Sequence, residues 1–99
     1  GKKVKVEFVN PDFMPHNIVF VKGKSGNEVA AAAIAMGADG FKAQFIPESD
    51  KIIAHTDMLD NKGEQTIEFI APTTPGDHDY VCTFPGHAIV MRGVMKVVK

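Results

Sequence analysis

The sequence predicts an all-β fold, a Greek-key β-sandwich with one short helical insertion. Short segments in which apolar and polar residues alternate recur along the chain, and clusters of Asn, Asp, Gly and Pro separate them. One alanine-rich run departs from this pattern. Because 99 residues with 44% hydrophobic content suit one compact core, we expect a single domain over residues 1–99.

The first strand is predicted at Lys3–Val9, where Val4, Val6 and Phe8 share one face and charged residues mostly occupy the other. The other strands are predicted from similar apolar or alternating runs that end at turn residues. We place them at residues 16–21, 51–56, 65–70, 79–84 and 93–98. In the segment 65–70, Ile67 and Phe69 should face inward.

The helical insertion is predicted to begin at Ser25, because Ser25 and Glu28 have the spacing of a capping box, in which the serine side chain caps the helix. Alanine, isoleucine and methionine favour a helix through Met36, and Gly37 is a stop signal. Residues 41–49 have no clean period and should form an irregular segment over the core. Tyr80 comes after a Pro-Gly turn and lies two residues before Cys82. This placement is typical of a tyrosine corner, in which the phenol forms a hydrogen bond to the backbone.

Charge does not select a partner for this chain. Eleven basic and twelve acidic residues give a formal charge of -1, without a block of like charge that would bind nucleic acid or an anionic membrane. No apolar run has the length of a membrane span. The single cysteine, Cys82, excludes an internal disulfide, and taken alone it would be interpreted as a small buried hydrophobe.

The most informative stretch contains Cys82, His87 and Met91, spaced Cys-x4-His-x3-Met. A soft thiolate, an imidazole and a weak thioether can supply three of four positions around copper, and His16 could supply the fourth. Zinc could also occupy nitrogen and sulfur ligands of this kind. Catalysis by Cys82 as a nucleophile would need an activating base and an oxyanion site, and the sequence signals neither.

Cys82-Thr83-Phe84-Pro85-Gly86-His87 followed by Met91 resembles the metal loop of the azurin-like cupredoxins, a family of blue copper electron carriers. The resemblance extends through Met14-x-His16-Asn17 and Ile53-Ala54-His55-Thr56. It implies one type 1 copper ion as cofactor, with His16, Cys82, His87 and Met91 as ligands. The backbone carbonyl before the first histidine would be a weak further contact, and Pro15 stands there where the family usually has glycine.

The resemblance also implies roles around the ligands. Backbone N–H groups of Asn17 and Phe84 would donate hydrogen bonds to the thiolate, and the Asn17 side chain would join the two ligand segments through Thr83. An apolar docking patch around His87 would comprise Met14, Met36, Phe84, Pro85, Ile89 and Val90, although Ile89 and Val90 could equally be core. His55 and His78 have no ligand spacing from Cys82 and are expected to be solvated.

The function implied is one-electron transfer between redox partners such as cytochromes or dehydrogenases, in the periplasm or another exported location. We do not expect an enzyme, because Val81 and Thr83 flank Cys82 and leave no histidine relay to a second copper. An electron-relay domain of a larger redox enzyme and a copper storage or structural sandwich remain alternatives.

Family domains carry a first strand region ahead of the point where this sequence begins. We therefore expect a domain excised from a longer chain, with an unpaired edge at Val4–Phe8 through which another chain could associate.

Overall fold

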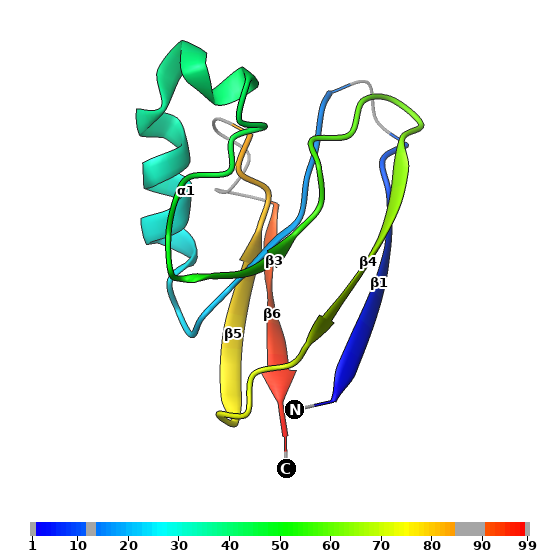
Figure 1. Cartoon of the computed structure of the whole chain (residues 1–99), viewed down its shortest axis with the longest axis vertical. Coiled ribbons are helices and arrows are strands. Elements are labelled where there is room, and N and C mark those ends of the chain that lie inside the picture. The colour runs from blue at the N-terminus through cyan, green and yellow to red at the C-terminus, as the bar shows by residue number, and fades with distance from the viewer. Residues whose placement is uncertain (1, 12–13, 85–90, 99) are drawn as a thin grey trace.

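The computed structural model describes residues 2–11, 14–84 and 91–98, and it contains two β-sheets with one helix on the outside (Figure 1). The first sheet pairs β1 with β4, and the second has the order β3-β2-β5-β6. All of these pairings are antiparallel. The elements are β1 (Lys3–Val9), β2 (Val19–Val21), α1 (Gly26–Ala35), the 3-10 helix η1 (Gly37–Phe41), β3 (Ile52–His55), β4 (Glu64–Ile70), β5 (Gly76–Val81) and β6 (Arg92–Val97).

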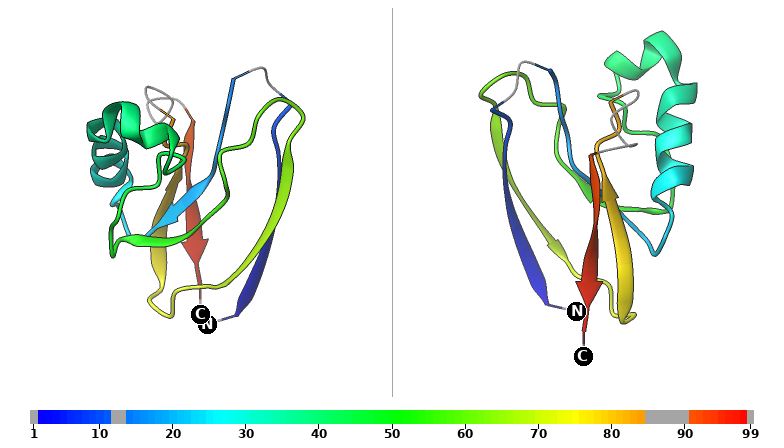
Figure 2. Two further views of the ribbon diagram at one scale, coloured as in Figure 1. Left: turned by 45° about the horizontal axis from the view of Figure 1, so that its top comes forward. Right: turned by 180° about the vertical axis from the view of Figure 1, so that it is seen from behind.

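The predicted β-sandwich with a single helical insertion is confirmed. The chain crosses from one sheet to the other between β1 and β2, between β3 and β4, and between β4 and β5, since β1 and β4 form one sheet while β2, β3, β5 and β6 form the other. Figure 2 shows the two sheets facing each other, with α1 against the outer side of the four-stranded sheet. Among the described residues, no helix is long and apolar enough to cross a membrane.

The tightest packing lies between the four-stranded sheet and α1. Val19, Val21 and Val81 form a fully buried cluster with Val29 of the helix. On the other face of β2, the Phe20 ring meets the Phe69 ring of β4 at a centroid distance of 5.0 Å. The inward-facing residues of β1 and β4 alternate with exposed ones as predicted, but they are only half-buried.

Two strands near the centre have bounds that differ from the prediction. β2 begins at Val19 instead of residue 16, because His16 makes an isolated bridge with Leu59 before the regular pairing starts. β5 runs from Gly76 to Val81, because pairing with β6 gives its polar first residues regular backbone partners. Cys82 therefore lies just beyond the end of β5 rather than inside a strand.

The predicted capping box is wrong. The helix begins after Ser25 as expected, but the Ser25 side chain makes no capping hydrogen bond. Instead, the Gly26 N–H donates to Oδ2 of Asp79 in β5 at 3.1 Å, and Arg92 of β6 lies 3.6 Å from the same oxygen. A carboxylate near a helix N-terminus is electrostatically favourable, so the cap is a tertiary contact that local spacing could not reveal.

Two further expectations for β5 need correction. The Tyr80 phenol makes no hydrogen bond to backbone among the described residues; its ring lies over Gly93, where an added Cβ would come within 2.3 Å of the phenol oxygen. His78 is buried rather than solvated. Its Nδ1 accepts the Gly23 N–H at 2.9 Å, and its Nε2 lies 3.1 Å from the Thr74 carbonyl oxygen. His55 is exposed, as predicted.

Candidate metal centre

His16 and Cys82 come together at one end of the four-stranded sheet. His16 lies three residues before β2, and Cys82 directly follows β5. Because β2 and β5 are antiparallel neighbours, with Val19 paired to Val81, the start of one strand meets the end of the other. The result is a distance of 3.8 Å between Nδ1 of His16 and Sγ of Cys82, two residues 66 positions apart.

The backbone on both sides of His16 is fixed. Its N–H donates to the Leu59 carbonyl at 3.0 Å, and its carbonyl accepts the Leu59 N–H at 2.8 Å. The imidazole is 5% exposed. Pro15, which precedes it, is half-buried. The two backbone bonds and the burial together restrict where the imidazole can lie.

Burial raises the pKa of the Cys82 thiol above its ordinary value of 9.0, while hydrogen bonds from the backbone N–H groups of Asn17 and Phe84 act in the opposite direction. Burial disfavours the thiolate because the charge loses its hydration, and the two donors partly replace that hydration. The residue is 3% exposed. At neutral pH the metal-free site therefore holds a protonated thiol, and a metal that binds sulfur must displace the proton.

Asn17 and Thr83 join the two segments that carry His16 and Cys82. Nδ2 of Asn17 donates to Oγ1 of Thr83 at 2.8 Å, and the Thr83 backbone N–H donates to Oδ1 of Asn17 at 2.8 Å. Nδ2 also donates to the Gln44 carbonyl at 3.4 Å. Both residues are almost completely buried. The two reciprocal bonds set the spacing between the histidine and the cysteine.

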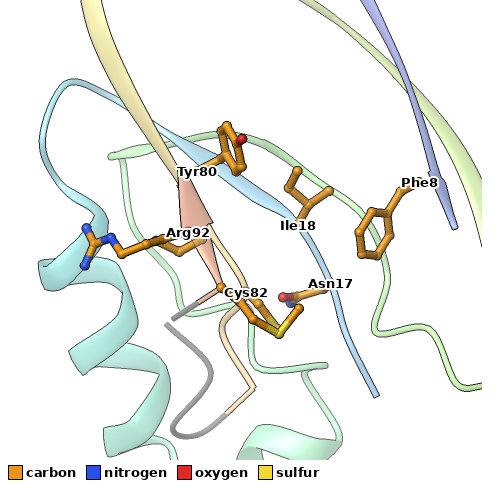
Figure 3. A pocket seen from close by; sticks show the side chains of 8 residues that line it. Phe8, Asn17, Ile18, Tyr80, Cys82 and Arg92 are labelled. Atoms are coloured by element: carbon orange, nitrogen blue, oxygen red, sulfur yellow. The ribbon is translucent and has the colours of Figure 1, made fainter. Parts of the chain in front are cut away.

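Met91 lies next to Cys82 although it comes nine positions later in the sequence. The Cys82 N–H donates to the Met91 carbonyl at 2.9 Å, and the two side chains line the same cavity of about 240 Å³. Figure 3 shows this cavity, with Phe8 approaching from β1 across from Tyr80 and Cys82, while Arg92 points toward α1. Met91 is thus brought to the same cavity as the cysteine.

His87, Pro85, Ile89 and Val90 fall in residues 85–90, outside the described part of the chain. Within the described part, no group of three or more His, Cys, Asp or Glu side chains is placed to hold a metal ion. Of the predicted docking residues that are described, Met14 is 49% exposed, whereas Met36 and Phe84 are half-buried. The roles of His87 as a ligand and of the Pro15 carbonyl as a contact remain predictions.

Two residues that support the site were not found from the sequence. Asn10 is fully buried, and its Nδ2 donates to the carbonyls of Met14 and Leu59 at 2.9 and 2.8 Å, so it holds the segment before His16 against the Leu59 loop. Phe45 is 2% exposed and meets the Phe84 ring at a centroid distance of 5.7 Å. In the sequence Asn10 begins an Asn-Pro-Asp cluster, which is typical of a turn and indicates no other role. Phe45 lies in the segment 41–49, which has no clean period to mark a buried residue.

The donor atoms fit a small soft or borderline metal ion. A metal–sulfur bond of about 2.3 Å and a metal–nitrogen bond of about 2.0 Å sum to about 4.3 Å. The 3.8 Å between Nδ1 of His16 and Sγ of Cys82 is shorter than this sum, so one ion can reach both atoms. Thiolate, imidazole and thioether together favour copper over hard cations, which prefer oxygen ligands.

The fold and this site define a β-sandwich protein with a buried sulfur and nitrogen metal centre at one end. Residues 1–98 match the family of copper binding proteins described as the plastocyanin/azurin family. The chain therefore belongs to the plastocyanin/azurin family, and copper is its cofactor.

The chain is 39% identical over 100 residues to auracyanin-B of Chloroflexus aurantiacus, a match that covers 95% of this chain and 41% of the relative. It is 33% identical over 88 residues to azurin of Bordetella pertussis, covering 86% of this chain and 57% of that protein. This chain therefore spans only about half the length of these relatives.

Solved structures agree with the assignment. A dithionite-reduced auracyanin of Roseiflexus castenholzii has a TM-score of 0.88 and 38% identity, covering all of this chain and 79% of that chain. Azurin Az-iso2 of a Methylomonas strain has a TM-score of 0.79 and 27% identity, covering 98% of this chain and 79% of that chain. The likeness thus extends over the whole of this chain.

Proposed function

We propose that this chain is a type 1 copper protein that carries single electrons between redox proteins. The observation that carries the proposal is the buried Cys82 thiol, 3.8 Å from His16 Nδ1, in a chain of the plastocyanin/azurin family. Copper held by a thiolate, imidazoles and a weak thioether can alternate between two oxidation states. The ligands proposed are His16, Cys82, His87 and Met91, with the Pro15 carbonyl as a weak contact.

The chain's own residues keep the ligands in nearly one arrangement. Asn17 and Thr83 bind the two ligand segments to each other, and Leu59 holds the backbone of His16 from the other side. Backbone N–H groups of Asn17 and Phe84 donate to the sulfur, which stabilises negative charge there. A site that needs little rearrangement between oxidation states can exchange electrons with a small energetic cost.

Partners are proposed to dock beside the metal end through an apolar patch that includes Met14, Met36, Pro85 and Ile89. Met14 supports this, because it lies two residues before His16 and is 49% exposed. The partners would be cytochromes or dehydrogenases, met in short encounters over a small interface. Auracyanin A is described as a "blue" copper protein from a photosynthetic bacterium, which supports a role in electron transport. The proposed location is the periplasm or another exported compartment.

The test is the visible spectrum of the copper-loaded chain. We expect an intense blue colour that disappears on reduction and returns on oxidation. Cys82→Ser should abolish the colour, because the thiolate that gives rise to it is lost, whereas His55→Ala, at an exposed histidine away from Cys82, should leave it unchanged. Colour retained in Cys82→Ser would refute the assignment.

Two other functions predict different results. A storage or structural site would give a colourless copper(I) or zinc protein without an accessible redox couple. An electron-relay domain of a larger redox enzyme would share the blue spectrum, so it must be separated by a second measurement. We expect the isolated chain to exchange electrons with a small cytochrome in solution, and Met14→Lys to slow that exchange while the spectrum stays the same.

A further inference from the structure

A second cavity, of about 830 Å³, lies toward the opposite end of β5 from Cys82. Its lining comes from the turn between β2 and α1, the start of β3, the end of β4 with the loop that follows it, and His78 of β5. His78 precedes Cys82 by four positions, so about 13 Å of extended strand separates this cavity from the metal centre. None of the described residues that line it belongs to β1 or β6.

Lysines supply all the acidic or basic charge in this lining other than His78. Lys22, Lys24 and Lys51 line the cavity, and the lining includes no Asp or Glu. Among the described residues, none of the three lysines forms an ion pair. The Lys22 N–H donates to the Lys51 carbonyl at 2.7 Å, so these two residues stand opposite each other where β2 ends and β3 begins. Like charges opposite each other are destabilising, and a bound anion would offset their repulsion.

The turn that carries two of the lysines is fixed on β5 through Gly23. Its N–H donates to Nδ1 of His78 at 2.9 Å, and its carbonyl accepts the Asp79 N–H at 2.8 Å. Because Nδ1 accepts, Nε2 carries the ring proton and donates to the Thr74 carbonyl at 3.1 Å. The His78 ring, 6% exposed, therefore joins this turn to the loop after β4. A ligand would meet a frame that is ordered before binding, which lowers the entropic cost of binding.

The other walls of the cavity are largely apolar. Ile52, Ile53 and Pro72 are half-buried there, and Ile70 is 62% exposed. Ligand sites are typically concave, about 300–1,000 Å³ in volume, and mostly apolar with a few polar groups that orient the ligand. Free cations beside an apolar wall suit a molecule that has a negative group at one end and an apolar body.

We propose that this cavity binds a small organic anion with an apolar body, of which a medium-chain carboxylate is the simplest example. The negative group lies between Lys22 and Lys51, Lys24 adds positive charge at the rim, and the apolar body lies over Ile53 and Ile70. Binding is reversible and involves no covalent or redox step. The site is separate from the copper centre and does not depend on the proposed electron transfer.

The test is a titration with sodium octanoate, below the concentration at which it forms micelles, followed by amide NMR shifts at neutral pH and low ionic strength. The copper(I)-loaded chain is used because that ion is diamagnetic, and the metal-free chain in reducing buffer should give the same result. We expect saturable shifts at Gly23, Lys51 and Ile53, and no shift at Asn17 or Thr83 beside Cys82. Shifts that do not saturate, or that centre on another part of the chain, would overturn the proposal.

Two further probes separate the charged end of the ligand from its apolar body. Affinity should rise about tenfold or more from butanoate to octanoate, because four more methylene groups reach the apolar wall. The uncharged 1-octanol should bind about fivefold more weakly than octanoate or worse, because it cannot pair with the lysines. Equal affinity for butanoate and octanoate would indicate a counter-ion on surface lysines only, and equal affinity for octanol and octanoate an apolar void only. Either result would refute the proposed ligand class.

Variants identify the residues. Lys22→Gln and Lys51→Gln should each weaken octanoate binding about three- to fivefold. Lys62→Gln removes the same charge from an exposed turn outside the cavity and should leave binding unchanged. Ile70→Ser, at an exposed position, should weaken octanoate binding and leave butanoate binding unchanged. An equal loss in Lys62→Gln and Lys51→Gln would mean a general charge effect and would exclude a site at this cavity.

Discussion

Removing the Asn17 side chain should destabilise the metal-free protein strongly. Asn17→Ala removes three contacts: the bond from the Thr83 N–H at 2.8 Å, the bond to Thr83 Oγ1 at 2.8 Å and the longer bond to the Gln44 carbonyl at 3.4 Å. At about 1 kcal/mol for each bond, with more for a buried N–H left without a partner, the loss in unfolding free energy is about 3–4 kcal/mol. That is a large share of the stability of a small domain.

Thr83→Val is the matched comparison, because it replaces only the Thr83 hydroxyl, the acceptor of the Asn17 Nδ2 bond, by a methyl group. It removes the hydroxyl acceptor, but the Thr83 backbone N–H keeps Oδ1 of Asn17, and Nδ2 keeps the Gln44 carbonyl. The expected loss is about 1 kcal/mol. Urea unfolding followed by circular dichroism, in reducing buffer without metal, measures both values. Equal losses in the two variants would refute the view that the Asn17 side chain links the ligand segments.

Gly40→Ala should lower the unfolding free energy by about 2–3 kcal/mol in the same assay, because a Cβ there would lie 2.2 Å from the buried Phe45 ring. Gly37→Ala should lower it by only about 1 kcal/mol, because this glycine has a φ of +58° but open space around it. Asp79→Ala should lower the unfolding free energy by about 2 kcal/mol through loss of the helix cap, and Asp79→Asn, which keeps an acceptor for the Gly26 N–H, by clearly less. Raising the pH above 9.0 should destabilise the metal-free protein relative to Cys82→Ser, by up to about 1.4 kcal/mol per pH unit. Burial raises the pKa of the Cys82 thiol in the folded state, so the thiol of the unfolded chain ionises first as the pH rises. The stabilisation that is present below pH 9.0 is therefore lost as the pH rises toward the folded-state pKa. Parallel profiles of unfolding free energy against pH for the two proteins would contradict this.

The sequence was informative where function depends on spacing within one segment or on alternation within one strand. Alternation predicted β1 with its observed bounds and predicted which residues of β4 turn inward. It did not predict that β5 begins at Gly76, because that strand starts with polar residues that are ordered by pairing with β6. Local pattern also failed for the helix cap, which comes from Asp79, 53 residues away from the N–H it accepts.

The sequence by itself determined the chemical identity of the site. The order of cysteine, histidine and methionine in one loop, with a second histidine upstream, indicates a site for a soft or borderline metal such as copper, because ligand softness belongs to the residue type and needs no coordinates. Only the tertiary structure decided that β2 and β5 are neighbours, and hence that His16 and Cys82 stand 3.8 Å apart. It also decided that Asn10, Asn17 and Thr83 are buried and hold that spacing. Contacts between segments distant in the chain depend on sheet order and burial, which emerge only when the whole chain packs.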